Sequence, residues 1–341
     1  MTTPLLEVKD LCVEFGDVRS PVRVLDHVNL HLKPGEILGI VGESGCGKSM
    51  TSLAVLRLIP SPPGRITKGT ITLEGKNLLE LDERQMQDIR GNDVAMIFQE
   101  PMTALNPVFT IGQQITETIR RHERISAKQA RQKAVDLVTS VYIPEPERRL
   151  DQYPHELSGG MRQRAMIAMA LACRPKVLIA DEPTTALDVT VQAQIFDLLL
   201  ELRDKFNTAI ILITHNMGAV AELADRVMVM YAGRKIEEGS VDRVLLDPIH
   251  PYTKGLLDCV VNVERDSEKF SASAFLPEIP GVVPPLNELG NGCAFAPRCK
   301  FVMDKCHTER PLMAGPDNRL AACWLHTEPK HPEQIAEETA I

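Results

Sequence analysis

The sequence predicts an α/β fold with a mostly parallel sheet, an all-helical insertion and a small cysteine-containing C-terminal extension. Three observations carry this prediction. Short apolar runs alternate with helical periodicity, helical patterns alone fill residues 111–173, and a proline-rich stretch after residue 258 leads into four clustered cysteines. Strands that alternate with helices are typical of a parallel sheet covered by helices on both faces.

Each predicted core strand is a short apolar run. A strand buried on both faces is apolar throughout, because neither face meets water. The predicted strands are Leu5 to Val8, Ile37 to Val41, Val94 to Phe98, Val177 to Ala180, Ile210 to Ile213 and Arg226 to Met230. In the helical insertion, Ser126 is the expected N-cap of a helix whose small and apolar residues recur at helical spacing.

These changes of pattern divide the chain into three predicted parts. Residues 1–258 form the α/β domain, with a helical subdomain at about residues 111–173. Residues 259–326 form the extension, which holds the proline-rich stretch and the cysteine group. The polar and acidic end, residues 327–341, is expected to be disordered.

Composition narrows the class of protein. A formal charge of −8 argues against sequence-independent nucleic-acid binding, because neutralising phosphates needs an excess of lysine and arginine. No apolar run approaches the roughly 18 residues that span a bilayer. No basic segment followed by an apolar one opens the chain. We therefore expect a cytoplasmic protein whose membrane role, if it has one, comes through partners.

The segment GESGCGKS, from Gly42 to Ser49, fits the phosphate-binding loop pattern. It lies between a predicted buried strand and a helix-compatible stretch. This order of strand, loop and helix is required of a phosphate-binding loop, and a chance glycine-rich turn would not need it. Backbone N–H groups of such a loop wrap phosphates, and the following helix directs its positive end at them. Lys48 is predicted to contact the β- and γ-phosphates, and the Ser49 hydroxyl to bind Mg²⁺. The predicted nucleotide-binding residues here are Gly42, Ser44, Gly45, Cys46, Gly47, Lys48, Ser49 and Met50.

An acidic pair ends a second buried strand. Asp181 and Glu182 directly follow the run Val177 to Ala180. A carboxylate in this place can hold Mg²⁺, usually through water, and its neighbour can polarise the attacking water as general base. An acidic pair at a strand end is by itself a common surface feature. Together with the loop at Lys48, it predicts a second element of a phosphate site.

The segment from Leu157 to Arg164 predicts a second anion site. Ser158, Gly159 and Gly160 open a helix expected to continue through Ala172, with free N–H groups and the positive dipole end facing outward. Taken alone, this pattern is more typical of an ordinary N-capped helix. The octet LSGGMRQR, however, resembles the signature motif of the ABC transporter ATPases.

The resemblance implies roles for further residues. Gln99 matches the glutamine that contacts the Mg²⁺ and water region, and His215 the switch histidine that contacts the γ-phosphate. Asp188 closes the segment TALD, which resembles the D-loop of the family. Phe15 is either the aromatic residue that stacks on adenine or a core phenylalanine. The chain departs from the family at Asn216, where many members carry an acidic residue, and at Met50, where threonine is frequent and the side chain is expected to face the helix interior.

The family resemblance also implies partners. ATP bound at Lys48 of one subunit would be closed over by a segment such as Ser158 to Gly160 of another, in a head-to-tail dimer. The finer match is to ATPases of the peptide and nickel importer branch, and within it to dipeptide importers. It is carried by YPHEL before the signature, MRQR and MIAM after its glycines, HPYT at residues 250–253 and IPGVVP at residues 279–284. This implies a second, distinct ATPase, two membrane permeases and an extracytoplasmic peptide-binding protein, with this chain at the cytoplasmic face of the bacterial inner membrane.

The extension carries four cysteines with the spacing C-x5-C-x6-C-x16-C: Cys293, Cys299, Cys306 and Cys323. Four thiols gathered in a cytoplasmic segment suggest a metal site, but the spacing matches neither a common zinc module nor a ferredoxin run. The family resemblance favours a [4Fe–4S] cluster; zinc and unligated buried thiols are the alternatives. His307 and His326 are candidate alternate ligands, but the pattern favours exposed loop histidines. The scattered cysteines are expected to be small apolar fillers: Cys12, Cys46, Cys173 and Cys259.

Other functions fit the sequence less well. A ribosome-acting ABC protein normally carries two complete motif sets, and only one is present here. A chromosome or repair ATPase would separate Lys48 from Asp181 by a coiled coil, yet no heptads lie between them. A redox sensor would leave the ATP motifs unexplained. An importer for nickel or another solute remains an alternative within the same branch, as does an ABC exporter, which the extension disfavours.

Overall fold

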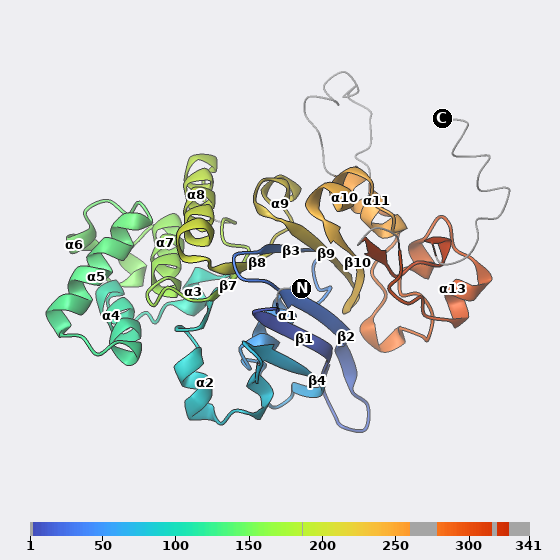
Figure 1. Cartoon of the computed structure of the whole chain (residues 1–341), viewed down its shortest axis with the longest axis horizontal. Helices are drawn as coiled ribbons and strands as arrows, with labels where there is room; N and C mark the ends of the chain where they lie inside the picture. The colour runs from blue at the N-terminus through green and yellow to red at the C-terminus, as the bar shows by residue number, and fades with distance from the viewer. Residues whose placement is uncertain (1–2, 186, 260–277, 316–318, 327–341) are drawn as a thin grey trace, which may run out of the picture.

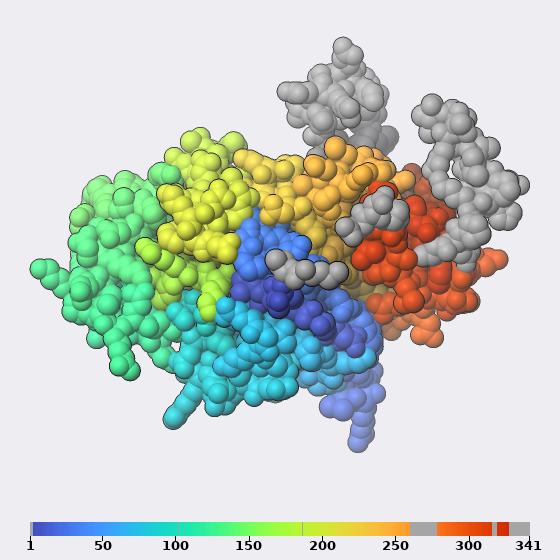
Figure 2. Space-filling model, in the orientation of Figure 1, coloured from blue at the N-terminus to red at the C-terminus, as the bar shows by residue number. Residues whose placement is uncertain are grey.

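The computed structural model describes residues 3–185, 187–259, 278–315 and 319–326. Figure 1 shows sheets at the centre of an elongated molecule, with the helices of residues 111–170 at one end and residues 278–315 and 319–326 at the other. The space-filling view in Figure 2 shows the same separation of the two ends by the sheet region. None of the helices within the described ranges is long and apolar enough to cross a membrane.

The larger sheet forms the centre of the α/β fold, and the prediction of a mostly parallel sheet is confirmed. Its strands are β3 (Ile37–Val41), β6 (Val94–Ile97), β7 (Val177–Asp181), β8 (Ala209–Ile213), β9 (Arg226–Tyr231), β10 (Arg234–Ser240) and β11 (Leu320–Ala321). The order is β11-β10-β9-β3-β8-β7-β6, and the run from β9 to β6 is parallel. Alternate residues of β7 pack into two apolar clusters, one on each face of the sheet. Burial on both faces explains why unbroken apolar runs predicted these strands.

A second, antiparallel sheet packs on one face of the first, and the sequence predicted little of it. Its strands are β1 (Leu6–Phe15), β2 (Val22–Leu32), β4 (Arg65–Leu73) and β5 (Lys76–Asn77), in the order β2-β1-β4-β5. The predicted strand at Leu5 to Val8 is only the start of β1. Beyond it the register with β2 is irregular, and Asp10 has φ of 54°. This irregularity interrupts the two-residue alternation by which a half-buried strand is recognised.

Residues 101–170 contain helices and turns without a strand. The helices are α3 (Pro101–Ala104), α4 (Ile111–His122), α5 (Ala127–Ser140), α6 (Pro146–Leu150) and α7 (Gly159–Ala170). Ser126 is the N-cap of α5, as predicted: its Oγ accepts from Gln129 N at 3.3 Å, and the Gln129 side chain accepts from Ser126 N at 2.9 Å. Helix α7 ends two residues earlier than predicted, because Leu171 and Ala172 form a turn that closes it.

The other α-helices of the described residues flank the sheets or belong to the extension. They are α1 (Lys48–Val55), α2 (Glu83–Ile89), α8 (Val189–Phe206), α9 (Met217–Leu223), α10 (Val241–Leu246), α11 (Pro251–Asp258) and α13 (Asp304–Thr308). The extension adds β11 to the main sheet, where Ala321 pairs with Glu237 of β10. Its end is therefore attached to the α/β core. The predicted disordered end, residues 327–341, and most of the predicted boundary after residue 258 lie outside the described residues.

A buried histidine joins this attachment to helix α11. His250 is 1% exposed, and its Nδ1 accepts from Tyr252 N at 3.0 Å as the N-cap of α11. Burial, with a smaller contribution from the charge of His326, lowers the pKa of His250 to about 3. Since the unfolded pKa is about 6.5, the contribution of this group to stability is complete above pH 6.5 and is lost as the pH falls toward 3.

We expect acid to destabilise the protein through His250. Lowering the pH from 7.5 to 5 should cost about 2 kcal/mol of unfolding free energy from this residue alone. The variant His250→Asn, which keeps an N-cap acceptor, should lose that part of the pH dependence, whereas His155→Asn on the exposed surface should keep it. Urea unfolding at the two pH values measures the difference. Equal pH dependence in both variants would contradict the assignment.

Candidate functional site

The predicted phosphate loop connects β3 to α1 and has a conformation that requires glycine. Gly42 has φ of 151°, and a Cβ there would lie 2.3 Å from Met230 O. Gly47 has φ of 102° and is the N-cap of α1, where a Cβ would meet Leu25 Cδ2 at 2.7 Å. A side chain at either position would force the loop to move. The sequence therefore fixes a tight loop at the N-terminus of a helix, the arrangement that receives phosphate groups.

Lys48 lies in this loop with its ammonium group turned onto the loop's own carbonyls. Its Nζ donates to Gly42 O at 2.7 Å and to Glu43 O at 3.0 Å, and the residue is 8% exposed. Ser44 and Gly45 are exposed next to it, and a Cβ on Gly45 would meet nothing within 4 Å. The loop thus presents a cation beside an open, exposed turn.

Asp181 ends β7 beside Ser49, so the predicted pair of Mg²⁺ ligands is brought together. The Ser49 hydroxyl hydrogen-bonds to the Asp181 carboxylate. Asp181 is 2% exposed, and its buried Oδ1 has no hydrogen-bond partner among the described residues. Burial raises the pKa of Asp181 above its usual value, against the hydrogen bond from Ser49. A buried oxygen without a partner is costly, and a hard divalent cation would satisfy it, so these residues fit Mg²⁺.

Glu182 and His215 also meet, although 33 positions separate them. Nδ1 of His215 lies 3.3 Å from Oε1 of Glu182, whose other oxygen accepts from Thr185 Oγ1 at 3.0 Å. The Glu182 side chain is 15% exposed, and that of His215 is 69% exposed. Buried Gln163 of α7 donates to Pro183 O. The carboxylate is thus oriented by His215 and Thr185. Thr185 and Gln163 entered the sequence prediction only as members of the TALD and LSGGMRQR motifs, without a role beside Glu182.

The other predicted ATP-site residues lie on separate elements. Gln99 is exposed just after β6, and Asp188 is the N-cap of α8, accepting from Val191 N at 2.9 Å. Met50 is half-buried against the apolar cluster, as expected for a helix-interior side chain. Phe15, at the end of β1, packs against the same cluster. This contact is the one expected of a core phenylalanine. Stacking on adenine would be a second role for the same ring.

The predicted signature segment begins α7 at the molecular surface. Ser158 Oγ accepts from Met161 N at 3.3 Å, which makes Ser158 the N-cap. Ser158 and Gly159 are exposed, and a Cβ on Gly159 would meet nothing within 4 Å. Among the described residues, no hydrogen bond connects the segment 158–160 to the phosphate loop. Within one chain, this helix N-terminus faces outward and is open to a partner.

The four cysteines of the extension line one small cavity, together with His250, Phe295 and Trp324. Burial raises the pKa of Cys293 and Cys299, and it raises the pKa of Cys323 to about 12, with the neighbouring thiols adding to the effect. Without a cation, Cys293, Cys299 and Cys323 are therefore protonated at neutral pH. Neither His307 nor His326 lines this cavity, and His326 Nε2 lies 2.7 Å from Ile249 O.

The spacing of these thiols bears on which metal fits. Zinc with Zn–S bonds of about 2.3 Å holds its four sulfur atoms about 3.8 Å apart. Among the described residues, no three of the four extension cysteines bring their sulfur atoms within 4.8 Å of one another. Four soft donors around one cavity are the ligand type that a thiophilic metal or an iron–sulfur group uses.

A second group of possible ligands, Cys12, Asp26 and His27, lies within 4.8 Å. The Asp26 carboxylate accepts from Arg23 at 3.2 Å, Arg234 at 2.8 Å and Arg310 at 2.9 Å. Three guanidinium groups around one carboxylate oppose a metal cation there. The sequence did not predict a site at these residues. Cys12 was predicted to be a small apolar filler, and this interpretation stands.

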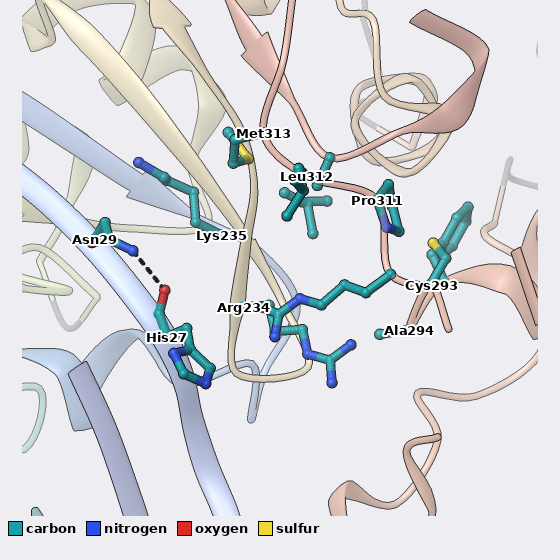
Figure 3. Close-up of a pocket in the computed structure, with 13 residues that line it drawn as sticks. His27, Asn29, Arg234, Lys235, Cys293, Ala294, Pro311, Leu312 and Met313 are labelled. Atoms are coloured by element: carbon teal, nitrogen blue, oxygen red, sulfur yellow. Dashed lines mark hydrogen bonds between the residues drawn. The ribbon is translucent and has the colours of Figure 1, made fainter. Parts of the chain in front are cut away.

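The cavity in Figure 3, of about 480 Å³, lies beside this group, between β2, β10 and the extension. His27, Arg234 and Lys235 border it on the core side, and Cys293 and Leu312 on the extension side. Three cationic side chains that line the cavity are already paired with carboxylates. Arg234 and Arg310 donate to Asp26, and Lys235 donates to Glu238. The cavity shares no residue with the predicted ATP site.

Comparison with known protein families identifies two regions. A model described as "ABC transporter" matches residues 25–185 and thus includes the phosphate loop, the segment from Ser158 to Gly160 and Asp181. A model described as "Oligopeptide/dipeptide transporter, C-terminal region" matches residues 236–306, which include three of the four extension cysteines.

Whole-chain relatives combine both regions. A probable peptide ABC transporter ATP-binding protein of Sinorhizobium fredii is 52% identical over 95% of this chain and 96% of its own length. The oligopeptide transport ATP-binding protein AppD of Bacillus subtilis is 50% identical over 95% of this chain and 97% of its own. The dipeptide transport ATP-binding protein DppD of Escherichia coli is 49% identical over 94% of this chain and 96% of its own length.

Solved structures match the core. A dimeric structure of the ATP-binding cassette MJ0796 in a post-hydrolysis state, bound to ADP and Pi, aligns with a TM-score of 0.64 at 26% identity. The match covers 69% of this chain and 98% of that one. The structure of cbiO1 from Clostridium perfringens, part of the transporter complex cbiONQ, aligns with a TM-score of 0.59 over 72% of this chain.

Proposed function

We propose a function from the premise that this chain belongs to the ABC transporter family, among the ATP-binding subunits with an oligopeptide/dipeptide C-terminal region. It is the ATP-hydrolysing subunit of a bacterial importer of dipeptides or oligopeptides. The observation that carries the proposal is the meeting of Lys48, Ser49 and Asp181 at one end of the parallel sheet in a chain that also carries that C-terminal region.

ATP would bind with its phosphates in the loop from Gly42 to Ser49. In this proposal the Lys48 ammonium leaves the carbonyls of Gly42 and Glu43 for the β- and γ-phosphates, which are stronger acceptors. Ser49 and Asp181 would hold Mg²⁺, which would neutralise charge on the phosphate oxygens, and Gln99 would contribute to the same site. Phe15, the last residue of β1, would stack on the adenine.

Glu182 is the proposed general base. Its carboxylate, held by Thr185 and close to His215, would accept a proton from the water that attacks the γ-phosphate. His215 is exposed enough to reach the phosphate, and its contact with Glu182 would relay the state of the nucleotide to the end of β8. Binding and positioning are thus divided among strand ends that the parallel sheet brings to one edge.

The outward-facing N-terminus of α7 supports a dimer. Ser158, Gly159 and Gly160 would close over ATP held by a partner subunit, and Asp188 would lie at the same interface. We propose that the partner is a second, distinct ATPase, and that the pair acts on two membrane permeases served by an extracytoplasmic peptide-binding protein. The chain would then work at the cytoplasmic face of the inner membrane as a peripheral subunit.

The four extension cysteines are proposed to hold one [4Fe–4S] cluster. Their common cavity supports this assignment, as does the finding that, among the described residues, no three of their sulfur atoms lie within the 4.8 Å of one another that a compact zinc site would allow. A bound cluster would replace the four protons with metal bonds and give the extension a local core. None of the four cysteines belongs to the ATP motifs, so the cluster is assigned a structural part and no step of hydrolysis.

Co-purification and uptake test the function. Tagged chain should recover two membrane proteins and a second ATPase, and the reconstituted assembly should take up labelled dipeptides when ATP is present. The variant Lys48→Ala should weaken ATP binding by at least about tenfold, because the ammonium contact to the phosphates is lost, and should abolish uptake. Uptake of Ni²⁺ without peptide uptake would replace the proposed substrate, and unchanged ATP affinity in Lys48→Ala would reject the phosphate-loop assignment.

A further inference from the structure

Glu43, the second residue of the phosphate loop, is held at three points. Its backbone N–H donates to Tyr252 Oη at 2.8 Å, and its backbone carbonyl accepts from Lys48 Nζ at 3.0 Å. Its carboxylate accepts two hydrogen bonds from Arg298, at 2.7 and 3.1 Å. Two of these three holds come from outside the ATP motifs. Tyr252 belongs to α11, and Arg298 to the cysteine-containing extension.

Arg298 uses all five of its N–H donors in this place. Nη1 and Nη2 each donate to one carboxylate oxygen of Glu43. The remaining donors reach Pro280 O at 2.9 Å, Ile279 O at 3.1 Å and Tyr231 Oη at 3.4 Å. A guanidinium group has five such donors in a fixed planar fork. With a side chain only 5% exposed, Arg298 is locked in one position.

An aromatic group fixes the same contact from the extension side. Phe295 is 4% exposed, and its ring centroid lies 5.3 Å from that of Tyr231 and 5.5 Å from that of Tyr252. Tyr231 ends β9, and Tyr252 carries the hydroxyl that accepts from Glu43 N. Phe295 and Arg298 are three positions apart, so one short turn of the extension carries both the ring that packs on Tyr252 and the guanidinium group that binds Glu43. Cys299 follows directly, which links this turn to the cysteine cavity.

We propose that Arg298 is a positioning residue of the ATP site, through which the extension sets the conformation and the charge of the phosphate loop. The carboxylate of Glu43 is a negative charge in the loop that must receive the phosphates of ATP, and a bidentate arginine neutralises it and turns it away from them. The inference rests on the proposed ATP site. It does not depend on which group the cysteines hold.

The expected consequence is weaker ATP binding when Arg298 is changed. Arg298→Gln should raise the Kd and the KM for ATP about tenfold with kcat within about twofold, because ground-state binding and not the chemical step is affected. Arg298→Lys has a point charge in place of the planar fork, so its Kd for ATP should lie between those of the unmodified protein and Arg298→Gln. The double variant Glu43→Gln with Arg298→Gln should recover most of the affinity, since the uncompensated carboxylate is then gone.

Arg319→Gln is the matched control. Arg319 is an arginine of the same extension with 14% side-chain exposure, but it pairs with Asp247, which is away from the loop. Equilibrium binding of ATP to the full chain and turnover in the assembled transporter are the measurements, with limited proteolysis to follow the extension. Unchanged ATP affinity in Arg298→Gln overturns the proposal. A loss equal to that of Arg319→Gln, with no recovery in the double variant, also overturns it. Loss of binding in Lys48→Ala alongside an unaffected Arg298→Gln would leave the proposed function standing and reject only this inference.

Discussion

Replacing Glu182 with glutamine is expected to lower ATP hydrolysis at this chain's site by about 100- to 10,000-fold, the usual contribution of a general base. Glutamine keeps the size and the acceptor for Thr185 Oγ1 but cannot take a proton at neutral pH. ATP binding should remain, because Lys48, Ser49 and Asp181 are untouched. Phosphate release from the assembled transporter and equilibrium ATP binding are the two measurements.

The matched control is Glu201→Gln. Glu201 is a half-exposed glutamate of α8 that pairs with Lys205 one helical turn away, so its change removes the same charge without touching the site. Its turnover should stay within about twofold of the unmodified protein, as for most surface substitutions. If Glu182→Gln turned over ATP as fast as Glu201→Gln, Glu182 would be no general base. If it lost ATP binding as well, its role would be structural.

The ATP-binding core was predictable because its signals are local. The strand Ile37–Val41, the glycine-rich turn and the following helix are contiguous, so one segment of sequence specifies strand, loop and helix in order. Asp181 is equally local, since it ends an apolar run. The parallel sheet then brings such strand ends to one edge, which is why residues 133 positions apart, Lys48 and Asp181, could be assigned to one site from their patterns.

Other contacts had no local signal. Arg298 and Glu43 are 255 positions apart, and an arginine before a cysteine belongs to no phosphate motif. Thr185 beside Glu182 depends on the turn after β7, where Glu182 takes φ of 49°. The antiparallel sheet was missed for a different reason, because the left-handed conformation of Asp10 breaks the alternation along β1. Long-range pairing and local irregularity are where a pattern of residue types says least.

The effect expected to be largest on the extension follows from removing two of its cysteines. The double variant Cys293→Ser with Cys306→Ser should lose iron and acid-labile sulfide together. Serine oxygen is a poor ligand for iron that thiolate holds, and two remaining thiols cannot retain a cluster. The unmodified protein, purified without oxygen, should be brown and contain iron and sulfide in equal amounts. Cys173→Ser with Cys259→Ser, two half-buried cysteines outside the cavity, is the matched control and should keep both.

Loss of the cluster should also weaken ATP binding, because it would loosen the turn that carries Arg298. The turn that carries Phe295 and Arg298 is packed between Cys293 and Cys299, so its position depends on what holds those two thiols. We expect the double variant to become protease-sensitive in the extension and to bind ATP more weakly, by no more than Arg298→Gln does. Zinc in place of iron would reject the cluster while keeping a structural metal, and a metal-free, protease-resistant extension would reject both. A cluster lost with ATP affinity unchanged would leave the iron–sulfur assignment intact and show that the hydrogen bonds of Arg298 keep it in place without the cluster.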